Sequence, residues 1–317
     1  MTAVAALPVG VDGRIRAAEL DAYRAHGLKP VERVFNVDTG YGTTHVRVVE
    51  FGQHNPGRPV LLLHGVASVN VIAAPLIRAL GGRRVIAVDW PGHGLSGACV
   101  LPEGASLRDH ACAVITSILS TLDVPVVDLV GHSLGAQFSL YASLGMPHRV
   151  HRVVLLGAPG AALPGVRPVG AMKILAMRGI GPTVLSMPMS RSTFRRTNDQ
   201  MLGTGSVDAM GTVTERAGYL LGTRSANAAS IASFFRALIR HGKIRDGVAL
   251  TDEELGRVTH PVLMAWGDLD VFQTPSRAAG SIASFRDLRL RRIPGSGHAP
   301  WLQQESAVTE SIGGHLA

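Results

Sequence analysis

Strand-like and helix-like segments alternate along most of the chain. Two segments, residues 31–37 and 44–52, alternate apolar and polar positions, which predicts half-exposed strands that pair antiparallel. Residues 59–65 are continuously apolar, as expected for a strand that is buried on both faces. Further strands are predicted from residue 84 onward and at residues 124–131, 150–159, 260–270 and 288–298.

Helical segments fill most of the intervals between these strands. They lie at residues 69–80, 106–122, 133–145 and about 275–283, with a last one near the carboxyl end. Ser106 is expected to cap the second of them, with Asp109 in the capping-box position. The alternation predicts an α/β fold whose mainly parallel sheet is covered by helices on both faces.

The strand–helix alternation is interrupted between residues 160 and 247. This interval holds helical patches but no convincing buried strand, and the alternation resumes after it. We therefore predict an α/β core formed by residues 31–159 and 248–317, with residues 160–247 as a helical insertion. Residues 1–30 precede the core as a helical preface.

Composition narrows the class of protein. The chain has 317 residues, of which 46% are hydrophobic, and this is enough for one large core. Two cysteines, Cys99 and Cys112, give neither a disulfide framework nor a metal-ligand spacing. No apolar run reaches the roughly 18 residues of a membrane span, and the opening residues lack the regions of a signal peptide. We therefore expect a cytoplasmic protein that works as a monomer or a homodimer.

The net charge of +8 raises the question of a nucleic-acid partner. The positive charge is mostly arginine that is scattered through the chain, without a long basic block or interleaved aromatic residues. We therefore expect a small-molecule substrate and no nucleic acid.

Candidate chemistry begins at a serine between two glycines. Gly131, Ser133 and Gly135 form the pattern G-x-S-x-G at the point where a predicted strand becomes a predicted helix. Small residues on either side let the strand and the helix approach, and the serine hydroxyl is then held above the carboxyl ends of the sheet. Two readings stay open at this point, a nucleophile or an ordinary helix N-cap.

A serine hydroxyl becomes a nucleophile only beside a base, which in turn needs an orienting carboxylate. His298 is the candidate base because it follows the last predicted strand on a glycine-rich loop. Asp268 and Asp270 both follow the preceding strand. We expect Asp270 to be the carboxylate, since it lies further past the strand end and can reach across, whereas Asp268 is placed to close the turn.

Five motifs occur in order along the chain: "LLLHG", "DWPGHGLS", "GHSLGA", "AWGDLDVF" and "GSGHAPW". With them, residues 32–315 resemble the α/β-hydrolase family, in which the triad also runs in the order serine, acid, histidine. The resemblance implies an eight-stranded sheet, a helical cap at the insertion, no metal and no organic cofactor. It supports Asp270, the second aspartate of "WGDxD". Some relatives carry the acid after an earlier strand, but residues 153–198 contain no Asp or Glu.

By the same resemblance, the backbone N–H groups of Val66 and Leu134 form the oxyanion hole. Val66 follows His64 and Gly65 after the first buried strand, and Leu134 follows the candidate serine. The sequence is His-Gly-Val here, where some lipases and esterases have His-Gly-Gly-Gly. We expect His64 to be structural, together with the turn "DWPGHG" at residues 89–94.

The predicted insertion has two features that bear on the substrate. It holds six of the nine methionines: Met172, Met177, Met187, Met189, Met201 and Met210. These are either core residues of the insertion or an adaptable apolar wall of an acyl pocket. Residues 160–198 carry six basic residues and no acid: Arg167, Lys173, Arg178, Arg191, Arg195 and Arg196. They form either a solvated face or a receptor for a substrate carboxylate.

Together these features predict a serine hydrolase that cleaves a carboxylic ester or a lactone through an acyl-enzyme on Ser133. The substrate is expected to be small to medium and mainly apolar. One alternative is a carbon–carbon bond hydrolase that acts on a diketone-like substrate with the same triad. The other is a ligand-binding member of the family with little turnover.

Overall fold

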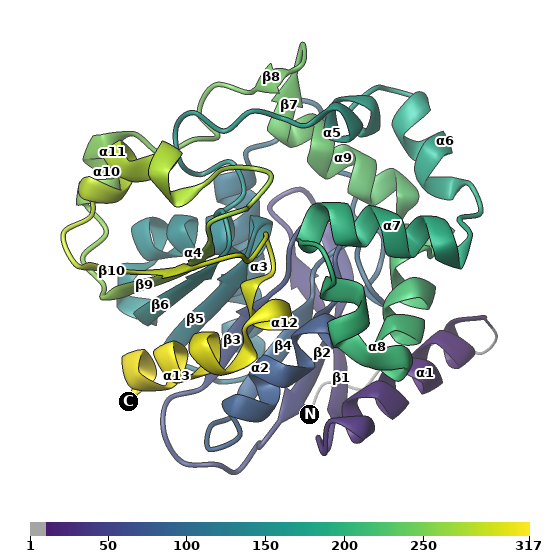
Figure 1. The fold of residues 1–317 in the computed structure, drawn as a ribbon, viewed down its shortest axis with the longest axis horizontal. Coiled ribbons are helices and arrows are strands. Elements are labelled where there is room, and N and C mark those ends of the chain that lie inside the picture. The colour runs from purple at the N-terminus through teal and green to yellow at the C-terminus, as the bar shows by residue number, and fades with distance from the viewer. Residues whose placement is uncertain (1–10) are drawn as a thin grey trace.

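The structure is a computed structural model that describes residues 11–317. The first ten residues of the predicted preface lie outside the described residues. The main sheet is built from β1 Val31–Asp38, β2 Thr43–Phe51, β3 Val60–Leu63, β4 Val85–Asp89, β5 Val127–His132, β6 Val150–Leu156, β9 Val262–Gly267 and β10 Leu288–Ile293. These eight strands lie in the order β1-β2-β4-β3-β5-β6-β9-β10 (Figure 1).

The sheet is antiparallel at one edge and parallel elsewhere. β1 pairs antiparallel with β2, and β2 pairs antiparallel with β4. Every pair from β4 to β10 is parallel. The antiparallel pairing that we expected for the two alternating segments is confirmed, and so is the mainly parallel eight-stranded sheet.

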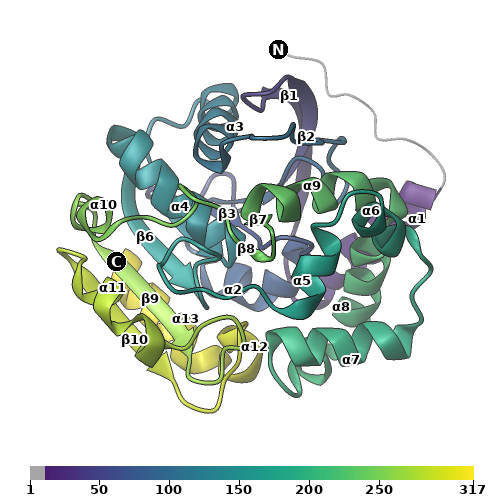
Figure 2. The ribbon, with the colours of Figure 1, turned by 90° about the horizontal axis from the view of Figure 1, so that it is seen from above.

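Helices cover both faces of the sheet. They are α1 Val11–Ala25, α2 Ala74–Ala79, α3 Leu107–Thr121, α4 Leu134–Gly145, α10 Asp252–Gly256, α11 Ala279–Ala283, α12 Pro300–Gln303 and α13 Glu305–Leu316. α3 and α4 lie on one face, and α2 and α13 lie on the other (Figure 2). The hydroxyl of Ser106 accepts a hydrogen bond from the N–H of Asp109 at 3.2 Å, as an N-cap of α3 should.

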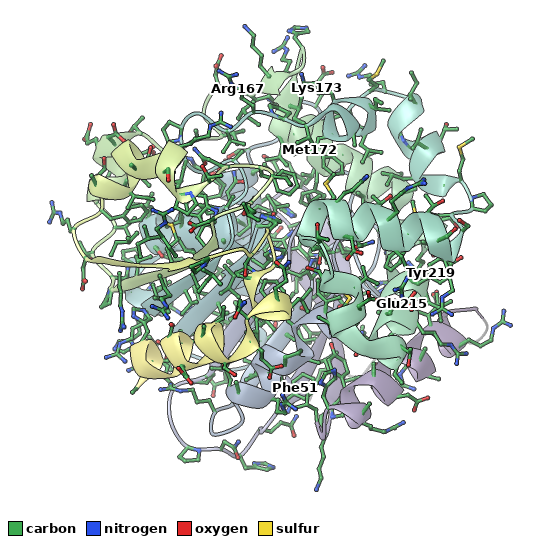
Figure 3. The ribbon with its side chains drawn as sticks, in the orientation of Figure 1. Phe51, Arg167, Met172, Lys173, Glu215 and Tyr219 are labelled. Atoms are coloured by element: carbon green, nitrogen blue, oxygen red, sulfur yellow. The ribbon has the colours of Figure 1, made fainter. Side chains whose placement is uncertain are left out.

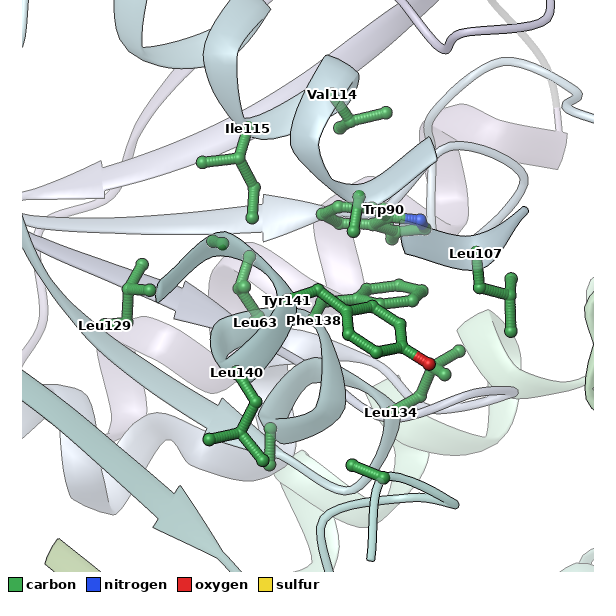
Figure 4. Close-up of a cluster of buried hydrophobic side chains, with 14 of the residues drawn as sticks. Leu63, Trp90, Leu107, Val114, Ile115, Leu129, Leu134, Phe138, Leu140 and Tyr141 are labelled. Atoms are coloured by element: carbon green, nitrogen blue, oxygen red, sulfur yellow. The ribbon is translucent and has the colours of Figure 1, made fainter. Parts of the chain in front are cut away.

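The two cores that result explain why the central strand β3 is apolar at every position. In β3, Leu61 and Leu63 pack into one core, whereas Leu62 packs into the other. Figure 4 shows part of the first core, where Trp90 and Phe138 pack with their ring centroids 4.6 Å apart. A strand with helices on both sides has no solvent-facing position, so a polar residue would be costly anywhere along it.

The interval between β6 and β9 is mainly helical. It contains α5 Gly170–Leu175, α6 Ile180–Ser186, α7 Arg191–Leu202, α8 Ser206–Gly222 and α9 Ala228–Leu238. Figure 1 shows α5, α6, α7 and α9 above the sheet. The only strands described within residues 160–247 are β7 Ile239–Arg240 and β8 Lys243–Ile244, a short hairpin that is separate from the main sheet.

Buried ion pairs connect the helix α1 to the sheet. Its Glu19 is fully buried and contacts Arg47 of β2, with 2.6 Å between Oε2 and Nη2. Arg47 also bonds Asp89 through Nη1 at 2.8 Å. Burial raises the pKa of Glu19 to about 7, and the Arg47 guanidinium opposes that rise. α1 also packs against α8, so this helix connects the sheet to the helical interval.

Candidate active site

Ser133 occupies a sharp turn between β5 and α4. Its backbone has φ 54° and ψ −117°, a conformation that costs a residue with a side chain on the order of 1–3 kcal/mol. The turn is held by a hydrogen bond from the N–H of Ser133 to the carbonyl of Leu156 in β6, at 3.3 Å. The serine side chain makes no capping hydrogen bond to α4. The interpretation as an ordinary N-cap therefore does not account for this residue.

Close packing around the turn explains the neighbouring glycines. A Cβ atom at Gly131 would lie 2.4 Å from the carbonyl oxygen of Gly135. A Cβ atom at Gly135 would lie 2.2 Å from the carbonyl oxygen of Leu63, at the end of β3. Gly65 passes so close to Ser133 that an added Cβ would be 2.9 Å from the serine Cβ. Only glycine fits at these three positions without displacing the backbone.

His298 and Asp270 are brought together at the carboxyl ends of β10 and β9. Nδ1 of His298 lies 2.7 Å from Oδ2 of Asp270, and both side chains are buried. The carboxylate accepts further hydrogen bonds from the N–H of Ala158 at 2.9 Å and the N–H of Phe272 at 3.0 Å. The indole N–H of Trp266 also lies 3.2 Å from Oδ2. These donors fix the carboxylate against the imidazole.

The environment keeps Asp270 ionised. Burial by itself raises the pKa of Asp270, but the nearby His298 and the two backbone N–H donors outweigh it, so the pKa lies below the usual value. Asp268 has a different place, because it accepts a hydrogen bond from Nε of the exposed Arg292 at 2.8 Å. Of the two candidate aspartates, the structure brings only Asp270 to His298.

The other ring nitrogen of His298 is free. Among the described residues, Nε2 of His298 has no hydrogen-bond partner although it is buried. The ring stacks at a tilt against Phe272, with the centroids 4.4 Å apart, and against His132 at 4.7 Å. His298 and Ser133 line the same cavity. A buried nitrogen that can accept a proton therefore shares this space with the serine hydroxyl.

The cavity is apolar and enclosed mostly by the helical interval. Its volume is about 280 Å³. Of the described residues that line it, none is Arg, Lys, Asp or Glu. Four of the six methionines of the interval belong to its wall: Met172, Met189, Met201 and Met210. Figure 3 shows Met172 below Lys173, on the side of the helical interval that faces the sheet.

Two backbone N–H groups lie beside the serine. Leu134 is the first residue of α4, so its N–H belongs to the helical turn that has no intrahelical acceptor. Val66 follows the close approach of Gly65 to Ser133. Both Val66 and Leu134 line the same cavity as Ser133.

His64, which follows β3, uses both of its ring nitrogens in contacts with the backbone. Its Nδ1 lies 2.7 Å from the carbonyl oxygen of Gly65, and its Nε2 accepts from the N–H of Trp90 at 3.1 Å. Burial lowers the pKa of His64, so the ring is held neutral. These bonds connect the loop that carries Val66 to the end of β4.

The basic residues of the helical interval do not reach the cavity. None of the six that we considered as carboxylate receptors lines it. Arg178 pairs with Glu103, and Arg191 and Arg195 both pair with the buried Glu215. Figure 3 shows Glu215 on the helical side of the molecule.

Sequence reasoning did not single out Phe272 and Trp266 as parts of this site. Phe272 packs on the His298 ring and donates its N–H to Asp270, and Trp266 donates to the same carboxylate. Their place in the motif "AWGDLDVF", immediately around the acid, was the available signal.

Comparison with known proteins settles the family. A model of the alpha/beta hydrolase family matches residues 60–310, which is most of the chain. The chain belongs to the α/β-hydrolase family.

Relatives within the family have two kinds of names. The chain is similar to 2-hydroxy-6-oxononadienedioate/2-hydroxy-6-oxononatrienedioate hydrolase from Klebsiella pneumoniae, with 24% identity over 90% of this chain and 95% of the relative. It is similar to the protein of the same name from Cupriavidus pinatubonensis, with 26% identity over 87% and 86%. In structure it resembles carboxylesterase CesB from Bacillus subtilis, with a TM-score of 0.71, 18% identity, and coverage of 97% and 98%. The curated relatives and the structural neighbour of this α/β-hydrolase are thus named for different activities.

Two further observations concern residues 11–317. None of their helices is long and apolar enough to cross a membrane. In the same range, no three His, Cys, Asp or Glu side chains come together as a possible metal site.

Proposed function

We propose that this protein is a serine hydrolase that cleaves a carboxylic ester or a lactone of a small to medium, mainly apolar substrate. The observation that carries the proposal is the shared cavity. A serine on a strained turn and the free nitrogen of a carboxylate-oriented histidine open into one apolar space. That combination can attack a carbonyl while excluding charged compounds.

The proposed reaction begins with attack by Ser133 Oγ on the ester carbonyl. Nε2 of His298 takes the hydroxyl proton and then gives it to the leaving alcohol. Asp270 holds the ring through Nδ1 and stabilises the imidazolium that forms. A water molecule that is activated by His298 then releases the acid from Ser133.

Charge that develops on the carbonyl oxygen needs donors on the opposite side. The N–H groups of Val66 and Leu134 are the proposed pair. Removing one such donor typically costs on the order of 10² to 10³ in rate, because the donors are fixed before the charge appears. Backbone donors cannot be deleted by simple substitution, so this part of the proposal relies on the position of both residues at the cavity wall.

We further propose that residues 160–247 form a cap that selects the substrate. The triad lies entirely outside this segment, on loops that follow β5, β9 and β10. The segment supplies most of the side chains of the cavity wall. Chemistry and selection are therefore assigned to separate parts of the chain.

Carbon–carbon bond hydrolysis is the second candidate, and the names of the curated relatives favour it. The dienedioates in those names carry two carboxylates. In this chain the described cavity wall offers no Arg or Lys to receive them, and burying an unpaired carboxylate is costly. A neutral ester therefore suits this cavity better than a dianionic diketone.

One set of assays separates the two candidates. Purified protein is given neutral p-nitrophenyl esters of increasing acyl length and, in parallel, a 2-hydroxy-6-oxo-dienedioate whose cleavage is followed by its absorbance. Ester turnover with weak or no cleavage of the dienedioate is expected. Faster cleavage of the dienedioate would reject the ester proposal in favour of the carbon–carbon bond hydrolase.

Covalent labelling tests whether Ser133 is an activated nucleophile. A fluorophosphonate should label Ser133, because the probe needs an activated serine and an oxyanion hole. Ser133→Ala is the matched blank. Labelling of neither protein would indicate a ligand-binding member of the family without an active nucleophile.

A further inference from the structure

A second cleft lies behind the wall of the active-site cavity. Its volume is about 520 Å³, within the range of small-molecule sites. The helices α5 and α9 separate the two spaces. Leu175 and Leu238 line the active-site cavity, whereas their chain neighbours Ala176 and Ala237 line the second cleft.

Arginines from three segments meet in this second cleft. Arg178 comes from the turn between α5 and α6, Arg236 from α9, and Arg240 and Arg245 from the β7–β8 hairpin and the residue after it. The one carboxylate in the lining is Glu103, which already pairs with Arg178 at the exposed rim. Within residues 11–317, Arg236, Arg240 and Arg245 form no ion pair.

The backbone that carries Arg240 is set by the tight turn of the β7–β8 hairpin. The hairpin turn uses His241 and Gly242, both with positive φ, which is the turn that matches the twist of two paired strands. Lys173 of α5 lies against the same turn, since a Cβ atom at Gly242 would be 3.8 Å from its Cδ. Figure 3 shows Lys173 at the top of the molecule, beside this hairpin.

Gathering like charges in this way is unfavourable in the free protein. Burial lowers the pKa of Arg236, and the charge of Arg178 lowers it further. Arginines on an ordinary solvated face point apart, so their repulsion is screened by water and salt. Here Arg178 and Arg240 are exposed and Arg236 and Arg245 are half-buried, but all four line one cleft, and a bound anion would reduce the repulsion between them.

We propose that this arginine cleft binds a small organic phosphate. A phosphate offers oxygens in several directions and up to two charges, which suits guanidinium groups that approach from different segments. A carboxylate has only two coplanar oxygens. The apolar side chains of Leu101, Pro182 and Ile239 complete the cleft and can contact the organic part of the ligand. The proposal does not depend on the reaction at Ser133.

Calorimetric titration of the full chain tests the site. The probes are inorganic phosphate, pyrophosphate and glycerol 3-phosphate, at constant ionic strength. The double variant Arg236→Gln/Arg240→Gln should bind each probe at least about tenfold more weakly, because it loses two charged hydrogen-bond donors. The matched control is Arg289→Gln/Arg291→Gln on β10, which removes the same charge from two exposed positions and should bind like the parent.

Thermal unfolding gives an independent readout. Each phosphate that binds should raise the melting temperature of the parent and the control, but not that of the Arg236→Gln/Arg240→Gln variant. Without ligand, this variant should melt no lower than the parent, since it relieves repulsion. A lower melting temperature would mean that the arginines stabilise the fold, and would overturn the proposal.

Further probes distinguish a lipid phosphate from a soluble phosphate, and a phosphate from a carboxylate. Vesicles that contain phosphatidate are compared with vesicles of phosphatidylcholine alone. Binding to phosphatidate vesicles without binding of soluble phosphates would assign the phosphate to a lipid. Failure of both, equal binding of succinate, or equal weakening in the β10 control would each reject a phosphate site.

Discussion

The carboxyl edge of the sheet and the helices that lie over it are packed in different ways. At the edge, a Cβ atom at Gly135 or Gly267 would come within 2.2 Å of a backbone oxygen. In the helical interval, Gly170 and Gly205 have no atom within 4 Å of an added Cβ. Backbone lies on backbone at the two edge glycines and also at Gly181 of α6, where an added Cβ would be 2.1 Å from the carbonyl oxygen of Leu175, whereas Gly170 and Gly205 adjoin space that side chains can fill.

Exposure follows the same division. β3, β5 and β9 are buried along their whole length. The helices α5 and α6 and the residues beside them instead expose five large apolar side chains: Ile174, Met177, Ile180, Val184 and Met187. The edge that holds the proposed triad can change little without loss of the fold. If the proposed function is correct, the helices over it can change the substrate without contact with that triad.

The largest expected effect is on catalysis at the edge. Ser133→Ala should reduce kcat by about 10⁶-fold, the size seen when a triad nucleophile is removed. Its stability should stay within about 0.5 kcal/mol of the parent, because one hydroxyl that caps nothing is lost. Ester assays and denaturant unfolding measure the two quantities. Parent-like ester hydrolysis by this variant would remove Ser133 from the mechanism.

The second prediction separates the two aspartates. Asp270→Asn should lower kcat by about 10⁴-fold, since an amide at this position favours the wrong imidazole tautomer. Asp268→Asn should lower it by less than about tenfold, because Asp268 only accepts from the exposed Arg292. Steady-state kinetics of the two variants decide the matter. The opposite ranking would make Asp268 the acid.

The third prediction compares a glycine from each region in the first turn of a helix. Gly135→Ala in α4 should cost about 3 kcal/mol or more of unfolding free energy, because the new Cβ overlaps the backbone of Leu63. Gly170→Ala in α5 should be neutral or stabilise by up to about 1 kcal/mol, since its Cβ meets open space. Urea titration measures both. Similar values for the two would erase the contrast between the regions.

The smallest effect concerns the choice of substrate. Met172→Ala enlarges the cavity, so the preferred acyl chain should lengthen by about two methylenes, with up to about fourfold in kcat/KM per methylene. Met187→Ala is the control, because Met187 is 62% exposed and does not line the cavity. A chain-length series of neutral esters shows the optimum. An unchanged optimum in Met172→Ala would remove this side chain from the acyl pocket.

The local sequence pattern was sufficient to predict the elements that carry the three proposed catalytic residues. Ser133, Asp270 and His298 each follow a strand of the parallel part of the sheet, and the carboxyl ends of parallel strands meet at one edge of a sheet. Pattern could not reveal the role of α1, whose Glu19 contacts Arg47 across a gap in sequence. Because these two residues are far apart in the chain, no periodic pattern in the sequence around either of them indicates their ionic contact.

The helical interval shows the same limit. Its methionines were visible in the sequence, but only the fold separates Met172, which lines the cavity, from Met187, which faces solvent. The arginines were visible too, yet Arg236 and Arg240 come together with Arg178 only through the packing of α9 against α6.

The sequence by itself determined the mainly parallel sheet, the turn at Ser133 and the expectation that Asp270 rather than Asp268 pairs with His298, because each is indicated by a local pattern of strands, turns and motifs. Only the tertiary structure decided which side chains enclose the cavity and where charges gather without ion-pair partners in the described part of the chain. Those outcomes depend on distances between segments that are far apart in sequence. Such distances are fixed by the packing of whole helices and strands, to which many residues contribute a little and no short motif contributes enough.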